Sequence, residues 1–92
     1  MSLFTASSIS PVKRIVSKQS ITVAPASEAR LFFQMTVIRG DPVYIRRGST
    51  VEREGGLMLV GAGAAFRDDQ WKGDISVISD GTTLITGEIG YD

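Results

Sequence analysis

The chain has 92 residues, of which 42% are apolar and 22% charged, and its ten Lys and Arg balance its ten Asp and Glu. This length and composition are typical of one globular domain and exclude a disordered or fibrous protein. The chain holds no Cys and no His, which leaves no disulfide, thiol nucleophile, Ser-His pair or common zinc ligand, so we expect no enzyme, no cofactor and no metal site.

Residues 1–20 are expected to form an extended N-terminal arm ahead of a β-sandwich domain spanning residues 21–92. The arm is rich in Ser and Thr, and Pro11 bars a helix there. It carries three basic residues and no acid, whereas residues 21–92 carry seven basic and ten acidic residues. Such a segment suits the surface of another subunit, where it can add a strand to an open edge. The contacts expected from it are Leu3, Phe4, Ile9, Val12, Arg14 and Ile15.

The polarity and charge of the sequence argue against three other roles. The arm is too polar for a signal peptide, and no apolar run in the chain reaches the roughly 20 residues of a membrane span. Its positive charges are too few for nucleic-acid binding, which needs a dense basic block. We therefore expect a protein made in the cytoplasm with neither a membrane nor a nucleic-acid partner, and we expect a chain starting near Ile21 to fold but not to attach.

Turn signals at intervals of roughly 8 to 12 residues predict about seven short antiparallel strands in a compact sandwich or partly open barrel. The strands expected are residues 12–16, 19–23, 29–38, 42–47, 57–60, 74–79 and 82–89. Alternation of apolar and polar residues predicts the core face of the third and fourth strands. That face holds Leu31, Phe33, Met35, Val37, Val43 and Ile45, and the opposite face holds Arg30, Gln34 and Thr36.

Glycine and aspartate mark the turns. Arg39-Gly40-Asp41 and Asp80-Gly81 each predict a hairpin between the strands on either side. Residues 61–66 lack the Lys-Ser or Lys-Thr of a phosphate loop, so their small side chains are expected to let another backbone approach closely. Asp68 and Asp69 resemble a catalytic pair, but neighbours on a strand point to opposite faces, and we expect a solvated turn.

Arginines and one tryptophan complete the expected interface. Arg is favoured at protein interfaces because its planar fork binds carboxylates, so residues 30–53 are expected to meet an acidic partner surface. Trp71 is expected to cover an open end of the sandwich with its indole N–H bonded to a turn; alternatively, with Tyr44, it forms an aromatic platform for a sugar. The residues assigned to this part of the interface are Arg39, Arg46, Arg47, Arg53 and Trp71.

A longer pattern of residues resembles a known family. It consists of Arg30, Phe33-Gln34, residues 42–45, 48–51, 55–59, 71–73 and 80–83, and Glu88. With these residues the chain from 21 to 89 resembles the small β-sandwich virion accessory proteins of tailed bacteriophages. Met35 and Thr36 depart from the Asn and polar turn typical of that family, so the first hairpin strand is expected to run longer and its tip to lack an inherited binding surface.

The resemblance implies a non-enzymatic virion protein that binds the major capsid protein and decorates or cements the head. Two alternatives stay open: a head-to-tail or tail adaptor subunit, which would assemble as a ring, and a carbohydrate-binding module using Trp71 and Tyr44. Away from a capsid we expect a trimer or dimer, because the arm and residues 61–65 would otherwise expose apolar surface and bare backbone.

Overall fold

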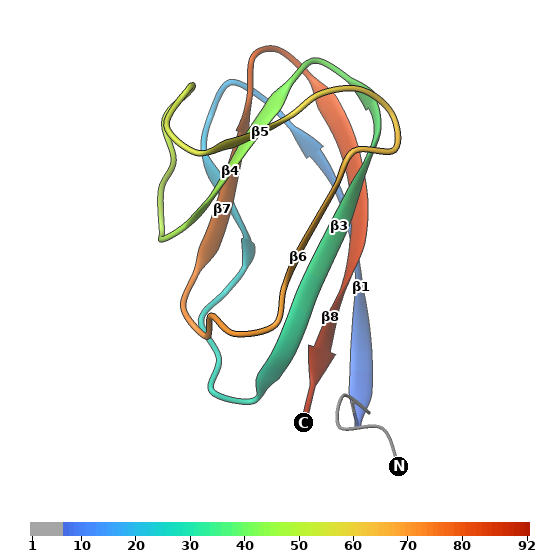
Figure 1. Cartoon of the computed structure of the whole chain (residues 1–92), viewed down its shortest axis with the longest axis vertical. Coiled ribbons are helices and arrows are strands. Elements are labelled where there is room, and N and C mark those ends of the chain that lie inside the picture. Colours follow the sequence, from blue (N-terminus) through green and yellow to red (C-terminus); the bar gives the residue numbers. More distant parts are fainter. Residues whose placement is uncertain (1–6) are drawn as a thin grey trace.

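The computed structural model describes residues 7–92, which form eight antiparallel strands in two four-stranded sheets (Figure 1). The strands are β1 (Ser8–Val16), β2 (Ile21–Ala24), β3 (Arg30–Gly40), β4 (Val43–Arg47), β5 (Leu57–Leu59), β6 (Ala65–Asp68), β7 (Ile75–Ser79) and β8 (Thr83–Tyr91). Sheet A has the order β1-β8-β3-β6, and sheet B has the order β2-β7-β4-β5. The predicted all-β sandwich is confirmed.

The predicted boundary of the arm at residue 20 is wrong, because β1 belongs to sheet A. It pairs with β8 without interruption from Ser8 opposite Tyr91 to Val16 opposite Thr83. Val16 is fully buried in the core, and Val12 packs against the core from the sheet edge. Residues 1–6, which include Leu3 and Phe4, lie outside the described part of the chain.

Both predicted hairpins are wrong, because each turn carries the chain from one sheet to the other. β3 pairs with β8 in sheet A, whereas β4 pairs with β7 in sheet B. The two turns therefore lie side by side and bond to each other: the Asp41 N–H donates to the Thr82 carbonyl at 3.1 Å, and the Asp80 N–H donates to the Pro42 carbonyl at 3.0 Å. Gly40 has φ +120°, and a Cβ there would overlap the backbone of Thr82, so this corner needs glycine.

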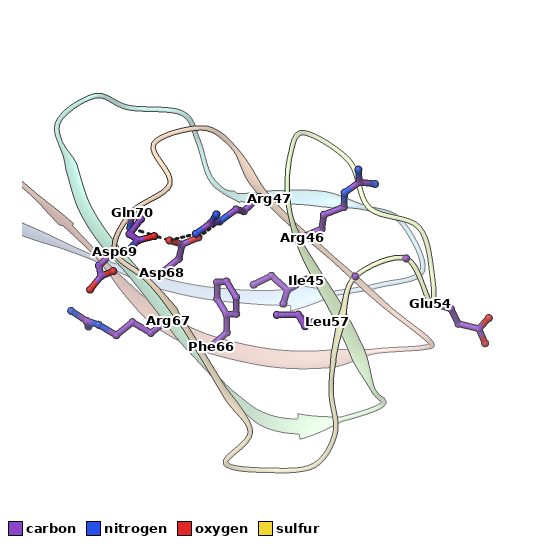
Figure 2. A pocket seen from close by; sticks show the side chains of 12 residues that line it. Ile45, Arg46, Arg47, Glu54, Leu57, Phe66, Arg67, Asp68, Asp69 and Gln70 are labelled. Atoms are coloured by element: carbon purple, nitrogen blue, oxygen red, sulfur yellow. Dashed lines mark hydrogen bonds and ion pairs between the residues drawn. The ribbon is translucent and has the colours of Figure 1, made fainter.

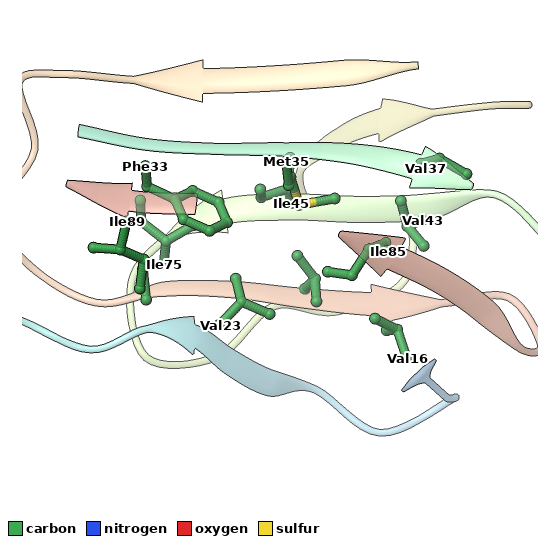
Figure 3. Packing of buried hydrophobic residues seen from close by; sticks show 12 residues of the cluster. Val16, Val23, Phe33, Met35, Val37, Val43, Ile45, Ile75, Ile85 and Ile89 are labelled. Atoms are coloured by element: carbon green, nitrogen blue, oxygen red, sulfur yellow. The ribbon is translucent and has the colours of Figure 1, made fainter. Parts of the chain in front are cut away.

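The core between the sheets confirms most of the predicted alternation (Figure 3). Its buried members include the predicted Phe33, Met35, Val37, Val43 and Ile45, joined by Val16, Val23, Ala24, Ile75, Val77, Ile85 and Ile89. Leu31 is only half-buried, because the pairing of β3 with β8 shifts register between Arg30 and Phe32. A second, smaller cluster joins Tyr44, Val51 and Ile78.

Strand β6 was not predicted from the sequence. It follows the glycine-rich residues 61–64 and pairs with β3, from Ala65 opposite Thr36 to Asp68 opposite Phe33. Gly61 and Gly63 have φ of +88° and +90°, and nothing lies within 4 Å of a Cβ built on either. The glycines thus supply a backbone conformation that other residues rarely adopt, and the expected close approach of another backbone is wrong within this chain.

Candidate functional site

A cleft of about 810 Å³ opens along one side of the sandwich, between β4 and β5 of sheet B and β6 of sheet A (Figure 2). Ile45, Leu57 and Phe66 converge at its centre and form an apolar floor, whereas the side chains of Arg46 and Glu54 point outward. The cleft exists because β5 and β6 are the last strands of their sheets and lie on the same side. Two other hollows on residues 7–92 have smaller volumes, of about 500 and 200 Å³.

An ion pair closes one end of this cleft and joins the two sheets. Arg47 on β4 donates from Nε and Nη2 to the carboxylate of Asp68 on β6, at 2.7 and 3.1 Å. Asp68 Oδ1 also accepts the backbone N–H groups of Gln70 and Trp71, at 3.0 and 3.1 Å. Asp68 is therefore a buried acceptor with four bonds, and the predicted solvated turn is wrong for it, although Asp69 does point elsewhere and is exposed.

The surroundings of Asp68 lower the pKa of its carboxyl. Burial pushes its pKa upward, but the hydrogen bonds from Arg47, Gln70 and Trp71 outweigh burial and lower the pKa from 3.8 to about 2. A carboxyl with a lowered pKa stabilises the fold while it is ionised. That stabilisation is complete at neutral pH and is lost as the pH falls below 3.8 and through about 2.

Asp68→Asn tests this pH dependence. Asn keeps an oxygen for the N–H groups of Gln70 and Trp71 but loses the charge-assisted bonds to Arg47, so we expect a loss of about 1–3 kcal/mol in the free energy of unfolding at pH 7. The difference from the parent should shrink steadily on acidification, because the parent loses the same bonds on protonation. Urea unfolding at several pH values between 7 and 2 measures it, and a difference that stays constant would contradict the assignment.

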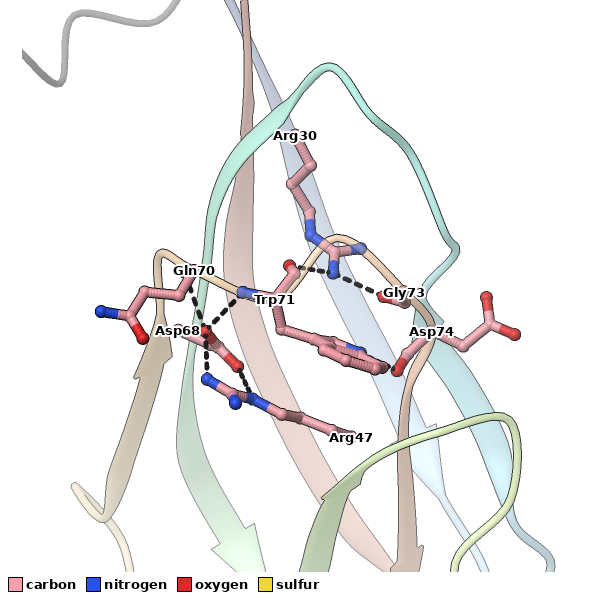
Figure 4. Close-up of polar contacts among 7 residues, drawn as sticks. All are labelled: Arg30, Arg47, Asp68, Gln70, Trp71, Gly73 and Asp74. Atoms are coloured by element: carbon pink, nitrogen blue, oxygen red, sulfur yellow. Dashed lines mark hydrogen bonds and ion pairs between the residues drawn. The ribbon is translucent and has the colours of Figure 1, made fainter.

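The loop between β6 and β7, residues 69–74, is also held by a buried arginine, Arg30 (Figure 4). Arg30 is 1% exposed, and its guanidinium donates to the carbonyls of Pro25, Trp71 and Gly73 at 2.8, 2.8 and 2.6 Å. Burial lowers the pKa of Arg30 against the attraction of Asp68. The sequence placed Arg30 on the polar face of its strand, and it missed that the loop after β6 folds over this side chain.

Trp71 lies on the surface of that loop at the end of the sandwich. Its indole N–H donates to the Asp74 carbonyl at 2.8 Å, which confirms the predicted bond to a turn. Trp71 is 40% exposed, and the Arg47 guanidinium lies 5.7 Å from the centroid of its ring. Tyr44 is buried beside Val51 and Ile78 and bonds to Asp80, so a sugar platform made by both aromatic residues is wrong.

The predicted interface residues do not form one surface. Ile9 and Ile15, 53% and 69% exposed, lie with exposed Arg14 and half-buried Val12 on β1, at the edge of sheet A away from the cleft. Arg39 lies next to Ile15 in a hollow that also includes Leu84. Arg46 and Arg47 line the cleft, and Arg53 pairs with Asp80 at 2.9 Å.

Sequence reasoning missed the cleft because its floor comes from three separate stretches of chain. Ile45 and Leu57 face each other in the β4–β5 pair, and Phe66 reaches the floor from the other sheet. One signal was present: in residues 65–68, Phe66 and Asp68 alternate with Ala65 and Arg67, as expected of a half-buried strand.

Over residues 7–92, no three His, Cys, Asp or Glu side chains gather closely enough to hold a metal ion. Nor does that part of the chain contain a helix of the length and hydropathy needed to cross a membrane. No protein-family model, curated protein or solved structure matches the chain.

Proposed function

We propose that this protein is a non-enzymatic structural protein of a tailed bacteriophage that binds the major capsid protein and decorates or cements the head. It would be made in the host cytoplasm and carried in the virion. The resemblance that supports this proposal covers residues 21–89, and the two-sheet architecture agrees with the sandwich that the resemblance implies. The stretch outside the resemblance includes β1, which makes β1 the part suited to a contact particular to this protein.

The observation that carries the proposal is the exposed face of β1. Ile9 and Ile15 stand largely in water on an edge strand, and Lys13 lies between them on the same face. Ile15 also lines the hollow that includes Arg39 and Leu84, so this face presents apolar and basic groups together. Large exposed apolar groups on a small domain mark a binding surface, and the basic groups suit an acidic capsid surface.

Ile15→Asp tests the proposal on phage particles. Burying an isoleucine at an interface contributes about 1.5–3 kcal/mol, so the substitution should weaken attachment by about ten- to a hundredfold. Undecorated heads are mixed with each variant, and the bound protein is measured after sedimentation. Ser49→Asp adds the same charge at an exposed position of the loop after β4 and should leave attachment unchanged. Equal attachment by both variants would contradict a capsid contact through β1.

Electron microscopy of labelled particles separates the alternatives. A decoration protein covers the whole head, whereas an adaptor labels one vertex or the tail and forms rings without a capsid. The exposed ring of Trp71 leaves a carbohydrate function as a further candidate. A change in Trp71 fluorescence on adding a glycan would favour that candidate, and labelling spread over the head would favour decoration.

A further inference from the structure

Among residues 7–92, no strand pairs with one edge of β6. β6 ends sheet A, and just before it the Val37 N–H donates to the Ala64 carbonyl at 2.8 Å. Backbone groups alternate in direction along an antiparallel strand, so the N–H and C=O groups of Ala65 and Arg67 point away from β3. They offer two donor and acceptor pairs to an extended segment lying beside β6.

The floor of the cleft adjoins this edge. An extended segment along β6 would place alternate side chains over Ile45, Leu57 and Phe66. Leu57 is 62% exposed, so the floor has apolar surface still to bury. The segment that fits carries a large apolar side chain at a position facing inward.

Residues 1–6 have this property. They read Met-Ser-Leu-Phe-Thr-Ala, with no charged side chain and with Leu3 and Phe4 at adjacent positions, so whichever face turns inward brings one large apolar side chain to the floor. Six extended residues span about 20 Å, which is longer than the four-residue β6. This segment lies outside the described part of the chain.

The segment cannot serve the cleft of its own copy. The Ser7 N–H donates to the Tyr91 carbonyl at 2.8 Å, which holds Ser7, the residue that follows the segment, at the β1 edge of sheet A. β6 lies three strand spacings away, or about 14 Å. Crossing that distance uses most of the roughly 20 Å available and leaves too few residues to run along β6.

We propose that residues 1–6 of a second copy bind in the cleft as an added strand on β6. The exchange joins copies of the chain through backbone hydrogen bonds and through Leu3 or Phe4 on the apolar floor. It concerns association of the purified protein, and it holds or fails whatever the assembled copies bind.

Ala65→Pro tests the acceptor edge. Proline removes the outward N–H of Ala65 and leaves the β3 side of the strand paired, since proline is tolerated where the N–H side faces solvent. Ala65→Val keeps the N–H and is the matched control. Sedimentation of the parent should show oligomers at micromolar concentration; Ala65→Pro should associate at least about tenfold more weakly, and Ala65→Val as the parent does.

The doubly substituted Leu3→Ser, Phe4→Ser chain tests the donor segment and keeps the sequence of all eight strands unchanged. It should associate at least about tenfold more weakly than the parent, whereas Ser2→Ala with Thr5→Ala should not. The Ala65→Pro chain keeps a donor segment and the Leu3→Ser, Phe4→Ser chain keeps an acceptor edge. A mixture of these two should therefore form a heterodimer that neither forms alone.

Four results would overturn the proposal, and three of them concern the parent and the variants above. These three are a parent that stays monomeric at micromolar concentration, a Leu3→Ser, Phe4→Ser chain that associates as the parent does, and a mixture without heterodimers although both variants unfold cooperatively. Oligomers lost only in Ile15→Asp would place the contact on β1 and would overturn it as well.

Discussion

Deleting residues 1–20 is expected to abolish cooperative unfolding at 25 °C, because the deletion removes β1. This strand pairs with β8 along its whole length, and fully buried Val16 lies in the core. Burial of one such side chain contributes about 1.5–3 kcal/mol, and the exposed edge of β8 adds further loss. A domain holds only about 5–15 kcal/mol in total, so the remainder should be largely unfolded. Circular dichroism during a urea titration measures it.

Deleting only residues 1–6 is the matched control. Every strand from β1 to β8 remains in that chain, so at a concentration at which the parent is monomeric its unfolding midpoint should stay close to that of the parent. This replaces the sequence-based expectation that a chain starting near Ile21 folds. Recovery of the parent's midpoint by the chain lacking residues 1–20 would mean that β1 adds little to the sandwich.

Arg30→Ala is expected to destabilise the protein by about 3–5 kcal/mol, because it leaves a cavity and three carbonyls without their donor. Those carbonyls belong to Pro25, Trp71 and Gly73, so the change should also release the loop that carries Trp71. Thermal unfolding gives the stability, and the fluorescence of Trp71, the only tryptophan, reports the loop.

Arg67→Ala is the matched control, since Arg67 is exposed on β6. Loss of an exposed arginine usually changes stability by less than about 0.5 kcal/mol. Because Arg67 donates a hydrogen bond to Gln34 and lies over the Phe32 ring, the expected loss is at the upper end of that range. Similar losses from both substitutions would show that the carbonyl contacts of Arg30 stabilise little.

Alternation of apolar residues was sufficient to predict the fold class and most of the core. Phe33, Met35 and Val37 face inward as their spacing requires. Alternation could not predict which strands pair. A tight turn at Gly40 has the same sequence signal whether it joins two strands of one sheet or connects one sheet to the other. The crossing is fixed by β8 beside β3 and β7 beside β4, which are contacts between distant parts of the chain.

The candidate sites show the same difference between local patterns and contacts of distant parts of the chain. Exposure of Ile9 and Ile15 was expected because they were assigned to an arm outside the sandwich; they are exposed on β1, whereas Val16 of the same stretch is buried in the core. The cleft was not predicted, since Ile45, Leu57 and Phe66 meet only after both sheets form. Arg47 was predicted to meet a partner's carboxylate, but it meets Asp68 of its own chain.

The central place of β8 in sheet A has a consequence for biosynthesis. Of the six strand pairings among residues 7–92, only that of β4 with β5 joins neighbours in sequence. Folding dominated by such distant pairings is slow, in the millisecond to second range. β8 is the last of these eight strands to leave the ribosome, and β1 and β3 have no shared partner until it emerges. Sheet A should therefore be completed only after β8 has emerged, and until then the apolar face of β3 stays exposed to aggregation.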